Sequence, residues 1–132
     1  MIAGIGTDIV CISHFEQALS KMGDKGIQRL FTPAEQACAK ARAALTIQTY
    51  AKRFAAKEAV AKALGTGIGA VAWTQIEITN NAQGAPMVQL HADAAKLLAE
   101  KGENPYIHLS LSDDGDYAQA FVVIEVAGSE ND

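Results

Sequence analysis

One stretch of the sequence decides the fold: RFAAKEAVAKALG, residues 53–65. Its Ala, Lys, Glu and Leu residues have high helix propensity, and a similar composition, without Gly, extends back to Pro33. Thr32 before that proline is a typical helix start, because proline suits the first helical position after a cap. Gly65 is the residue type that commonly ends a helix. The sequence therefore predicts helix from Pro33 to the end of this stretch, with one break near Thr46–Thr49, where β-branched residues cluster.

The region before this helix combines a strand with a short helix. Residues 1–12 are rich in Ile and Val, which favours a strand, and two glycines mark either a bulge or points where another backbone can approach closely. Ser13 and Glu16 have the spacing of a capping box. We therefore expect a helix from Ser13 to about Met22.

The C-terminal half of the chain changes from helical to strand periodicity. The expected elements are strands at 74–79, 87–90, 105–112 and 117–126, a helix at 93–101, and turns at 80–86 and 113–116. The resulting order, β-α-α-β-β-α-β-β, predicts an α+β fold in which an antiparallel sheet packs against a long helix. We expect one domain over residues 1–127 and a disordered tail at residues 128–132.

The composition argues against several classes of protein. With 132 residues, 49% of them hydrophobic, the chain has enough apolar material for one core. No apolar run reaches the ~18–20 residues that a membrane helix needs, and the N-terminus lacks the basic lead of a signal peptide. The two cysteines, Cys11 and Cys38, form neither a disulfide framework nor a metal spacing. We therefore expect free thiols in the reducing cytoplasm.

The charge is unevenly distributed along the chain. The net charge of −4 argues against a nucleic-acid partner. Residues 21–62 nevertheless hold nine of the eleven Lys and Arg residues and only three acidic residues, a net charge of about +6. This segment is either the solvated face of two helices or a surface for an acidic partner or a phosphate group, and charge alone favours neither.

Three charged residues, Asp8, Glu58 and Lys62, are candidates for a chemical role. Glu58 and Lys62 are four residues apart, so they lie one turn apart on one helix face. A surface ion pair is the simpler interpretation, although the surrounding alanines let a ligand come close. Asp8 follows two strand glycines and is either a turn or capping residue or, with Glu58, a carboxylate pair of the kind that holds Mg²⁺ together with substrate phosphates.

The segment HLSLS, residues 108–112, places His108, Ser110 and Ser112 on one face of a strand, most simply the polar outer face of a sheet. The sequence contains no nucleophile elbow, P-loop or zinc spacing, and nothing marks a Ser or Cys as a nucleophile. If the chain is a transferase, the attacking hydroxyl therefore belongs to the second substrate.

Three motifs together resemble the holo-acyl-carrier-protein synthases, the small class of 4′-phosphopantetheinyl transferases. GIGTDIV at residues 4–10 is similar to the family's G-x-G-x-D-I-V, and residues 53–65 are similar to its R-[FW]-x-x-K-E-A-x-x-K-A-x-G. The HLSLS segment is similar to the strand motif before the final hairpin, and Gly84-Ala85-Pro86 stands where the family usually has G-[KR]-P. The resemblance extends over about residues 2–126.

The resemblance implies a Mg²⁺-dependent enzyme of fatty acid biosynthesis that transfers 4′-phosphopantetheine from coenzyme A to a serine of acyl carrier protein and releases 3′,5′-ADP. The implied site residues are Asp8 and Glu58 for the metal, Glu58 and Lys62 for catalysis, and Arg53, Lys62, Pro86 and His108 for the coenzyme. The family is also typically homotrimeric, with active sites at subunit interfaces. Acyl carrier proteins are acidic, which would explain the basic segment at residues 21–62.

Two departures from the family pattern affect binding rather than the metal pair. The family often has arginine where this chain has His14, so we expect a weaker or pH-dependent carrier contact. Ala85 replaces the usual base, so one contact to the coenzyme is missing or supplied elsewhere. The general base stays open between Glu58, a metal-bound water and a group of a neighbouring subunit. Two rival readings are a module that binds coenzyme A or a carrier without turnover, and a purely structural oligomer.

Overall fold

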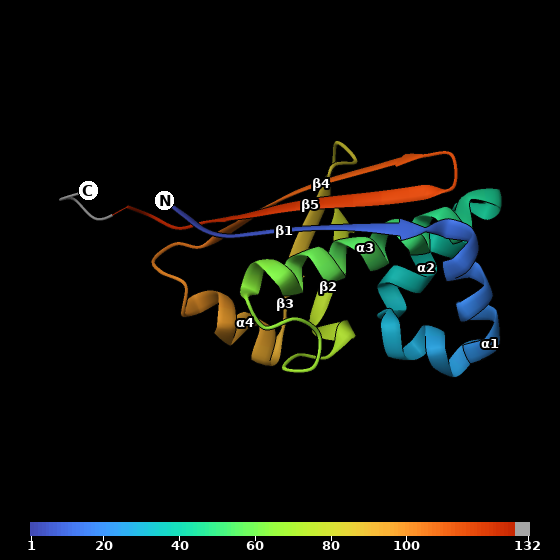
Figure 1. Ribbon diagram of the computed structural model, residues 1–132, viewed down its shortest axis with the longest axis horizontal. Helices are drawn as coiled ribbons and strands as arrows, with labels where there is room; N and C mark the ends of the chain where they lie inside the picture. The colour runs from blue at the N-terminus through green and yellow to red at the C-terminus, as the bar shows by residue number, and fades with distance from the viewer. Residues whose placement is uncertain (129–132) are drawn as a thin grey trace.

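The computed structural model describes residues 1–128, in which a long sheet lies over a layer of helices (Figure 1). The elements in chain order are β1 (Ile2–Cys11), α1 (Ile12–Leu30), α2 (Pro33–Ala41), the 3-10 helix η1 (Ala43–Leu45), α3 (Thr46–Leu64), the 3-10 helix η2 (Trp73–Gln75), β2 (Ile76–Asn80), β3 (Pro86–Leu90), α4 (Ala92–Ala99), β4 (Tyr106–Asp114) and β5 (Tyr117–Glu125). The predicted α+β fold is confirmed, and the predicted break divides the long helix into α2 and α3.

The described strands form two antiparallel sheets rather than one. β5 lies between β1 and β4, so that Val122 faces Gly6 on one side and Leu109 on the other. β2 and β3 form a separate hairpin, in which Ile78 pairs with Val88. Helix α3 contacts β1, β5 and β2, and therefore joins the two sheets. The expected packing of antiparallel strands against a long helix is confirmed.

Two glycines of β1 allow α3 to lie directly on the strand. A Cβ atom at Gly4 would collide with the carbonyl oxygen of Ala63, and one at Gly6 would collide with that of Ala59. The predicted close backbone approach is thus confirmed, and its partner is α3. Two residues of strand span about 6.6–6.8 Å and four residues of helix about 6 Å, so the contacts advance in step along both elements.

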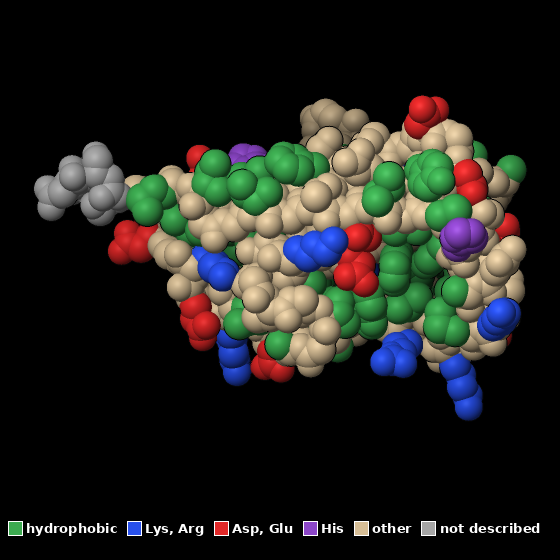
Figure 2. Space-filling model, viewed as in Figure 1, with side chains coloured by type: hydrophobic (Ala, Val, Ile, Leu, Met, Phe, Trp, Pro, Cys, Tyr) green, Lys and Arg blue, Asp and Glu red, His purple; other side chains and the backbone are tan. Residues whose placement is uncertain are grey.

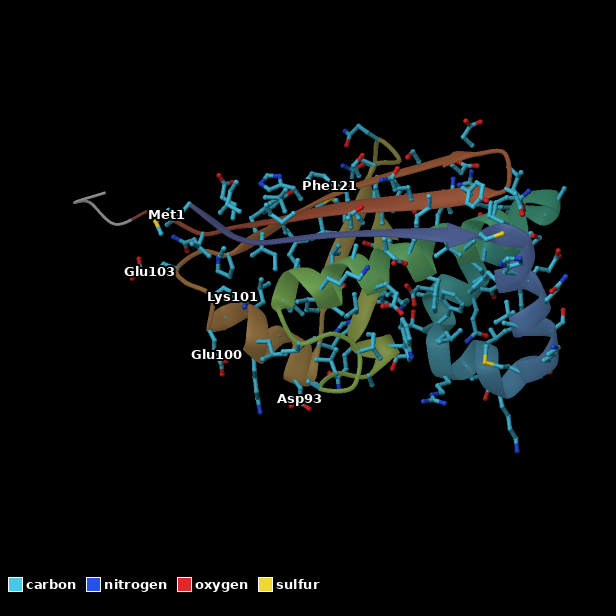
Figure 3. The ribbon with its side chains drawn as sticks, viewed as in Figure 1. Met1, Asp93, Glu100, Lys101, Glu103 and Phe121 are labelled. Carbon is cyan, nitrogen blue, oxygen red and sulfur yellow. The ribbon has the colours of Figure 1, made fainter. Side chains whose placement is uncertain are left out.

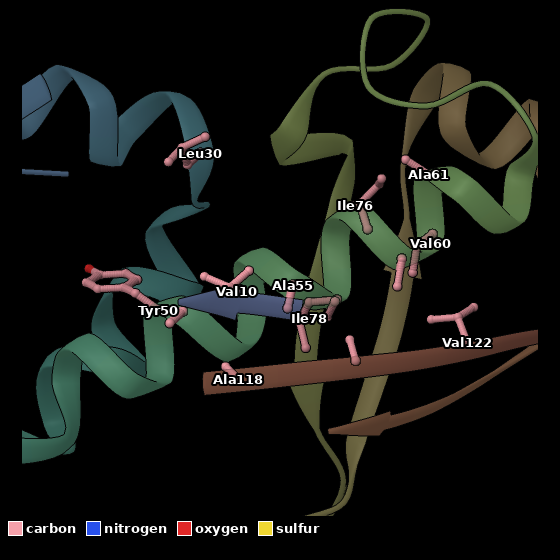
Figure 4. Packing of buried hydrophobic residues seen from close by; sticks show 14 of the residues in the cluster. Val10, Leu30, Tyr50, Ala55, Val60, Ala61, Ile76, Ile78, Ala118 and Val122 are labelled. Atoms are coloured by element: carbon pink, nitrogen blue, oxygen red, sulfur yellow. The ribbon is translucent and has the colours of Figure 1, made fainter. Parts of the chain in front are cut away.

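The core is built from small residues of α3 and the inward side chains of β5. Ala55, Ala56 and Ala59 of α3 are fully buried. Alternate residues of β5, from Ala118 to Ile124, are buried as well, while the residues between them are more exposed. Figure 4 shows labelled members of this cluster on three elements, among them Ala55 of α3, Val122 of β5 and Ile78 of β2. Because the alanines are short, the helix backbone comes close to the sheet.

Helix α1 differs from the expected helix in its start, and a second helical segment follows the expected end. The predicted capping box of Ser13 and Glu16 is wrong, because α1 begins after Cys11 without a local side-chain cap. The Asp116 carboxylate instead accepts hydrogen bonds from Ser13 N at 3.0 Å and from Ser13 Oγ at 2.6 Å. The first helical segment of α1 is interrupted at Gly23, whose φ of 66° is not helical, so the expected end near Met22 agrees with the structure, and a second segment continues α1 to Leu30.

The break between α2 and α3 lies at residues 42–45, earlier than predicted. Thr46 begins α3, and its hydroxyl donates to the carbonyl oxygens of Ala39 and Ala43. The Thr49 hydroxyl donates to Leu45 O in the same way. Because these hydroxyls bond back to preceding carbonyls, the helix tolerates the β-branched residues that were expected to interrupt it.

The remaining boundaries differ by a few residues from expectation. Helix α4 ends at Ala99, and the acidic residues Asp113 and Asp114 belong to β4, which leaves Gly115 and Asp116 as the turn. Apart from Gly128, the predicted disordered tail lies outside the described residues. Among residues 1–128, no helix combines the length and apolar character required to span a membrane.

Candidate active site

An open groove of about 510 Å³ runs between β1, α1 and α3. Its lining includes the polar side chains of Asp8, Glu58 and Lys62 and the aromatic rings of Phe15 and Phe54. Figure 2 shows the hollow, with hydrophobic side chains on its floor and acidic and basic side chains at its edge. The groove therefore places charged groups beside an apolar surface.

The packing of α3 on β1 brings Asp8 to this groove. Gly4 lies against Ala63 and Gly6 against Ala59, so β1 runs closely along α3, and Asp8 is the next position on the same face of the strand. Glu58, next to Ala59 on α3, lines the same groove as Asp8 and is close enough for the Asp8 charge to affect its pKa. Asp8 and Glu58, fifty residues apart in sequence, are therefore neighbours.

Lys62 contacts β1 directly. Its Nζ atom donates to Asp8 Oδ1 at 3.1 Å and to the carbonyl oxygen of Thr7 at 2.9 Å. The Lys62 side chain is 51% exposed, whereas the Asp8 side chain is 19% exposed. An ion pair of α3 was the simpler expectation for Lys62, but in the structure its carboxylate partner comes from β1.

Glu58 experiences competing electrostatic effects. Burial, followed by the negative charge of Asp8, raises the pKa of the Glu58 carboxyl above its ordinary value, and the Lys62 ammonium partly offsets this rise. Two close carboxylates repel each other unless a cation lies between them. The pair consequently has more negative charge than one lysine neutralises.

The donor set of the groove fits a hard divalent cation. Mg²⁺ commonly takes one or two protein carboxylates and completes its shell with water and substrate phosphate oxygens. Asp8 and Glu58 supply such a pair. Within residues 1–128 there is no cluster of three or more His, Cys, Asp or Glu side chains suited to a metal. The two carboxylates therefore match a metal that is held jointly with a phosphate-bearing ligand.

Arg53 and Pro86 lie together in a different place, at the β2–β3 hairpin. The buried Arg53 guanidinium donates to Ile78 O, to Asn80 Oδ1 at 2.7 Å and to Cys38 Sγ at 3.2 Å. Pro86 opens β3 and pairs with Asn80 across the hairpin. A cavity of about 250 Å³ is lined by Arg53, Cys38, Thr79 and Asn80, among others. Arg53 thus lines a pocket other than the groove of Asp8, and Pro86 pairs with a residue of that lining, Asn80.

His108 lies on the opposite side of the first sheet. It is exposed on β4, where its Nε2 is 3.1 Å from Glu125 Oε1 and its ring is 4.7 Å from that of Tyr106. Its register partner on β5 is Val123. The structure therefore brings Asp8, Glu58 and Lys62 together within one chain, but does not bring His108, Arg53 or Pro86 to them.

The sequence reasoning missed an important pair behind the groove. Lys57, next to Glu58, is fully buried, and its Nζ lies 2.7 Å from Glu35 Oε1. Burial lowers the pKa of Lys57, and Glu35 opposes this effect. The helical spacing offered one signal, because a lysine beside Glu58 points toward a different face of α3.

Both the sequence and the fold match known proteins. A family model described as the 4′-phosphopantetheinyl transferase superfamily matches residues 4–122. A holo-[acyl-carrier-protein] synthase of Cereibacter sphaeroides is 48% identical over 129 residues, which cover 95% of this chain and 93% of the relative. The crystal structure of such a synthase from Neisseria meningitidis matches with a TM-score of 0.84 at 43% identity, covering 95% of this chain and 99% of that chain. The structure from Bacillus anthracis, in complex with CoA (3′,5′-ADP), matches with a TM-score of 0.78 at 35% identity, covering 96% and 99%.

Proposed function

This chain belongs to the 4′-phosphopantetheinyl transferase superfamily, and we propose that it transfers the 4′-phosphopantetheine group of coenzyme A to a serine of acyl carrier protein. The relatives named above are holo-[acyl-carrier-protein] synthases, and one is in complex with CoA (3′,5′-ADP). The observation that carries the proposal is the convergence of Asp8, Glu58 and Lys62 at one groove. The released product is 3′,5′-ADP, and the modified carrier serves fatty acid biosynthesis in the cytoplasm.

In this reaction the serine oxygen forms a bond to the β-phosphorus of coenzyme A, and the bond from that phosphorus to the 3′,5′-ADP oxygen breaks. Such phosphoryl chemistry needs charge neutralisation and alignment more than covalent help from the protein. Lys62 is half exposed at the groove edge, where its ammonium can contact the phosphates while Asp8 orients it. The absence of a marked nucleophile in the sequence agrees with a hydroxyl supplied by the carrier.

Asp8 and Glu58 are the proposed Mg²⁺ ligands. When bound, Mg²⁺ would neutralise charge on the pyrophosphate of coenzyme A. The close carboxylates and the raised pKa of Glu58 support this assignment, because a divalent cation would relieve their repulsion. The apolar floor at Phe15 and Phe54 lies beside these groups and offers a surface for the carrier or for the pantetheine arm.

The carrier is the proposed partner of the basic segment at residues 21–62, since opposite charges speed the encounter of two proteins. His14 lines the groove at the start of α1. The family often has arginine at this position, so the His14 imidazole would give a weaker contact to the carrier than a guanidinium group.

We further propose a homotrimer with active sites at subunit interfaces. The face of the first sheet that points away from α3 exposes large apolar residues, including Ile5, Ile9 and Phe121. Figure 3 labels Phe121 on this sheet. Contiguous apolar surface of this kind marks an interaction site. His108 lies on this same sheet, away from Asp8. A second copy would therefore have to supply His108 and Pro86 if they bind the same coenzyme molecule as Lys62. A monomeric mass by light scattering would contradict the trimer.

The direct test incubates the protein with CoA, MgCl₂ and apo-acyl carrier protein, and measures the intact mass of the carrier. The expected result is a gain of one phosphopantetheine group on the serine, absent when EDTA is added. CoA binding without any mass gain would instead support a binding module. The absence of both CoA binding and a mass gain would support a structural oligomer.

A further inference from the structure

The buried ion pair behind the groove links four elements at one point. The Lys57 Nζ atom of α3 donates to Glu35 Oε1 of α2 at 2.7 Å, to Ile76 O of β2 at 2.5 Å and to Trp73 O of η2 at 3.1 Å. An ammonium group has three N–H donors, so every donor of Lys57 is used.

Glu35 is equally well satisfied on its side of the pair. Its Oε1 also accepts from Thr32 N at 2.9 Å, which completes the capping box of α2. Its Oε2 accepts from Ile78 N of β2 at 2.9 Å. Neither Glu35 nor Lys57 has an exposed side chain. Each hydrogen bond is directional, so together they fix where α2, β2 and α3 lie relative to one another.

The position of Lys57 on α3 connects this hub to the groove. Successive residues of a helix are about 100° apart, so Glu58 points about 100° away from Lys57 around the axis. Ala59 and Ala63, a further step around, face the glycines of β1. Glu58 is thus located between two contacts that together prevent rotation of α3: polar bonds at Lys57 and backbone packing at Ala59.

The two contacts differ in what they resist. The alanine–glycine contact is small and apolar, and it fixes how closely α3 approaches β1, but a helix can still turn slightly over such a surface. The three bonds of Lys57 depend on direction and resist that turning. A rotation that relaxed them would move Glu58 relative to Asp8.

We propose that Lys57 and Glu35 are positioning residues, whose buried bonds set the rotation of α3 so that Glu58 faces the groove beside Asp8. This inference rests on the proposed function, because its consequence is measured in the transfer reaction. It predicts that the ion pair contributes to catalysis beyond its contribution to folding.

The test compares a repacked pair with the native one. The double variant Lys57→Met/Glu35→Leu removes both charges and keeps apolar volume, so it avoids leaving one charge buried alone. Lys96→Met on the exposed surface of α4 is the control for a lysine-to-methionine change. The melting temperature, kcat, KM for CoA, and Mn²⁺ affinity in the presence of CoA by electron paramagnetic resonance are measured for each.

We expect the double variant to melt within a few degrees of the wild type, yet to lose at least about tenfold in kcat with little change in KM, since misplacement of a catalytic group acts mainly on the transition state. Its Mn²⁺ affinity should fall as well, and the control should match the wild type. A folded double variant with wild-type kcat and Mn²⁺ affinity would overturn the proposal and leave the pair a purely structural role.

A second variant covers the case in which the double variant does not fold. Glu35→Gln keeps the shape of the side chain and an acceptor oxygen but removes the charge that holds Lys57. A several-fold lower kcat at unchanged KM is expected, and an unchanged kcat would contradict the proposal. A wild-type protein without transfer activity would overturn both this inference and the proposed function, whereas an active wild type with unaffected variants would overturn this inference alone.

Discussion

Two polar clusters lie on adjacent faces of α3 and differ in almost every physical respect. The Lys57–Glu35 pair has no exposed surface and every hydrogen-bonding group that it presents is satisfied. The groove cluster of Asp8, Glu58 and Lys62 is open to solvent, and the pKa of Glu58 is raised by burial and by Asp8. A single helix thus contributes to one cluster that is complete and to one whose two carboxylates carry more negative charge than Lys62 neutralises.

This difference explains what each cluster is for. A complete cluster gains nothing from a ligand, so its bonds are available to stabilise the fold. An incomplete one is stabilised when a cation and phosphate arrive, which is the property of a binding site. Residues 57 and 58, although adjacent, therefore have opposite expected effects on stability and activity.

The largest expected effect is on activity at Glu58. Glu58→Ala should lower the transfer rate at least about a thousandfold, because it removes half of the carboxylate pair that neutralises developing charge. The melting temperature should stay the same or rise, since the repulsion with Asp8 disappears. Steady-state kinetics and thermal unfolding of the same preparation check both parts. A loss of activity accompanied by unfolding would make Glu58 structural and remove the contrast with Lys57.

The next effect is on stability at Lys57. Lys57→Met alone leaves Glu35 as an uncompensated buried charge, which typically costs about 3–5 kcal/mol. Urea unfolding should therefore show a much lower midpoint than for the wild type. Lys96→Met, at an exposed position, should change the free energy of unfolding by no more than about 0.5 kcal/mol. Equal effects of the two substitutions would contradict the description of Lys57 as a buried hub.

A smaller effect is expected at the contact that holds α3 against β1. Gly6→Ala places a Cβ atom on the carbonyl oxygen of Ala59, so the helix must move away. Overpacking of this kind typically costs about 1–3 kcal/mol. Because Asp8 is two residues along the same strand, kcat should fall as well. Wild-type stability and kcat in this variant would show that the close approach is not needed to assemble the groove.

The smallest effect is a pH dependence at Glu77, on the border of the buried cluster. Glu77 Oε2 accepts from Thr32 Oγ1 at 2.6 Å, and Oε1 lies 3.1 Å from His91 Nε2. The Thr32 hydrogen bond, and to a lesser extent His91, lower the pKa of Glu77 below its ordinary value. A carboxylate whose pKa is lower in the folded state stabilises the fold above its unfolded-state pKa, and this stabilisation is lost as the pH falls through the folded-state value.

Glu77→Gln should accordingly lower the melting temperature by a few degrees at pH 7. The difference from the wild type should narrow as the pH falls through the lowered pKa of the wild-type carboxyl, where that carboxyl becomes protonated. Thermal unfolding at several pH values measures this. A difference that is constant over that range would show that the Glu77 charge makes no contribution.

Much of the fold could be predicted because its signals are local. The Thr32 cap and Gly65 end the helical region at the predicted places, and the 80–86 turn joins the predicted hairpin. The start of α1 could not be predicted from local sequence, because its cap comes from Asp116, more than a hundred residues away. The propensity of Thr46 and Thr49 was misleading for a similar reason, since their hydroxyls find acceptors in the preceding turn.

The candidate site, like the fold, could be predicted from the sequence only in part. The spacing of Glu58 and Lys62 placed them on one helix face, but Asp8 joined them only through the family resemblance, because the contact depends on the packing of β1 against α3. The Lys57–Glu35 pair could not be predicted, because helical spacing shows only that Lys57 faces away from Glu58, and its partner is on a different element. Long-range pairs of this kind become visible only in three dimensions.

The central claim is that Asp8 of β1 and Glu58 of α3 act as one unit, and a double-mutant cycle tests it most directly. The values of kcat/KM for CoA are compared for the wild type, Asp8→Asn, Glu58→Gln and the double variant, with folding checked in each. If the two carboxylates serve one charge-neutralising site, the double variant should be no slower than the slower single variant, because the first change already disables the site. Losses that multiply in the double variant would show that Asp8 and Glu58 act independently, and would contradict the account.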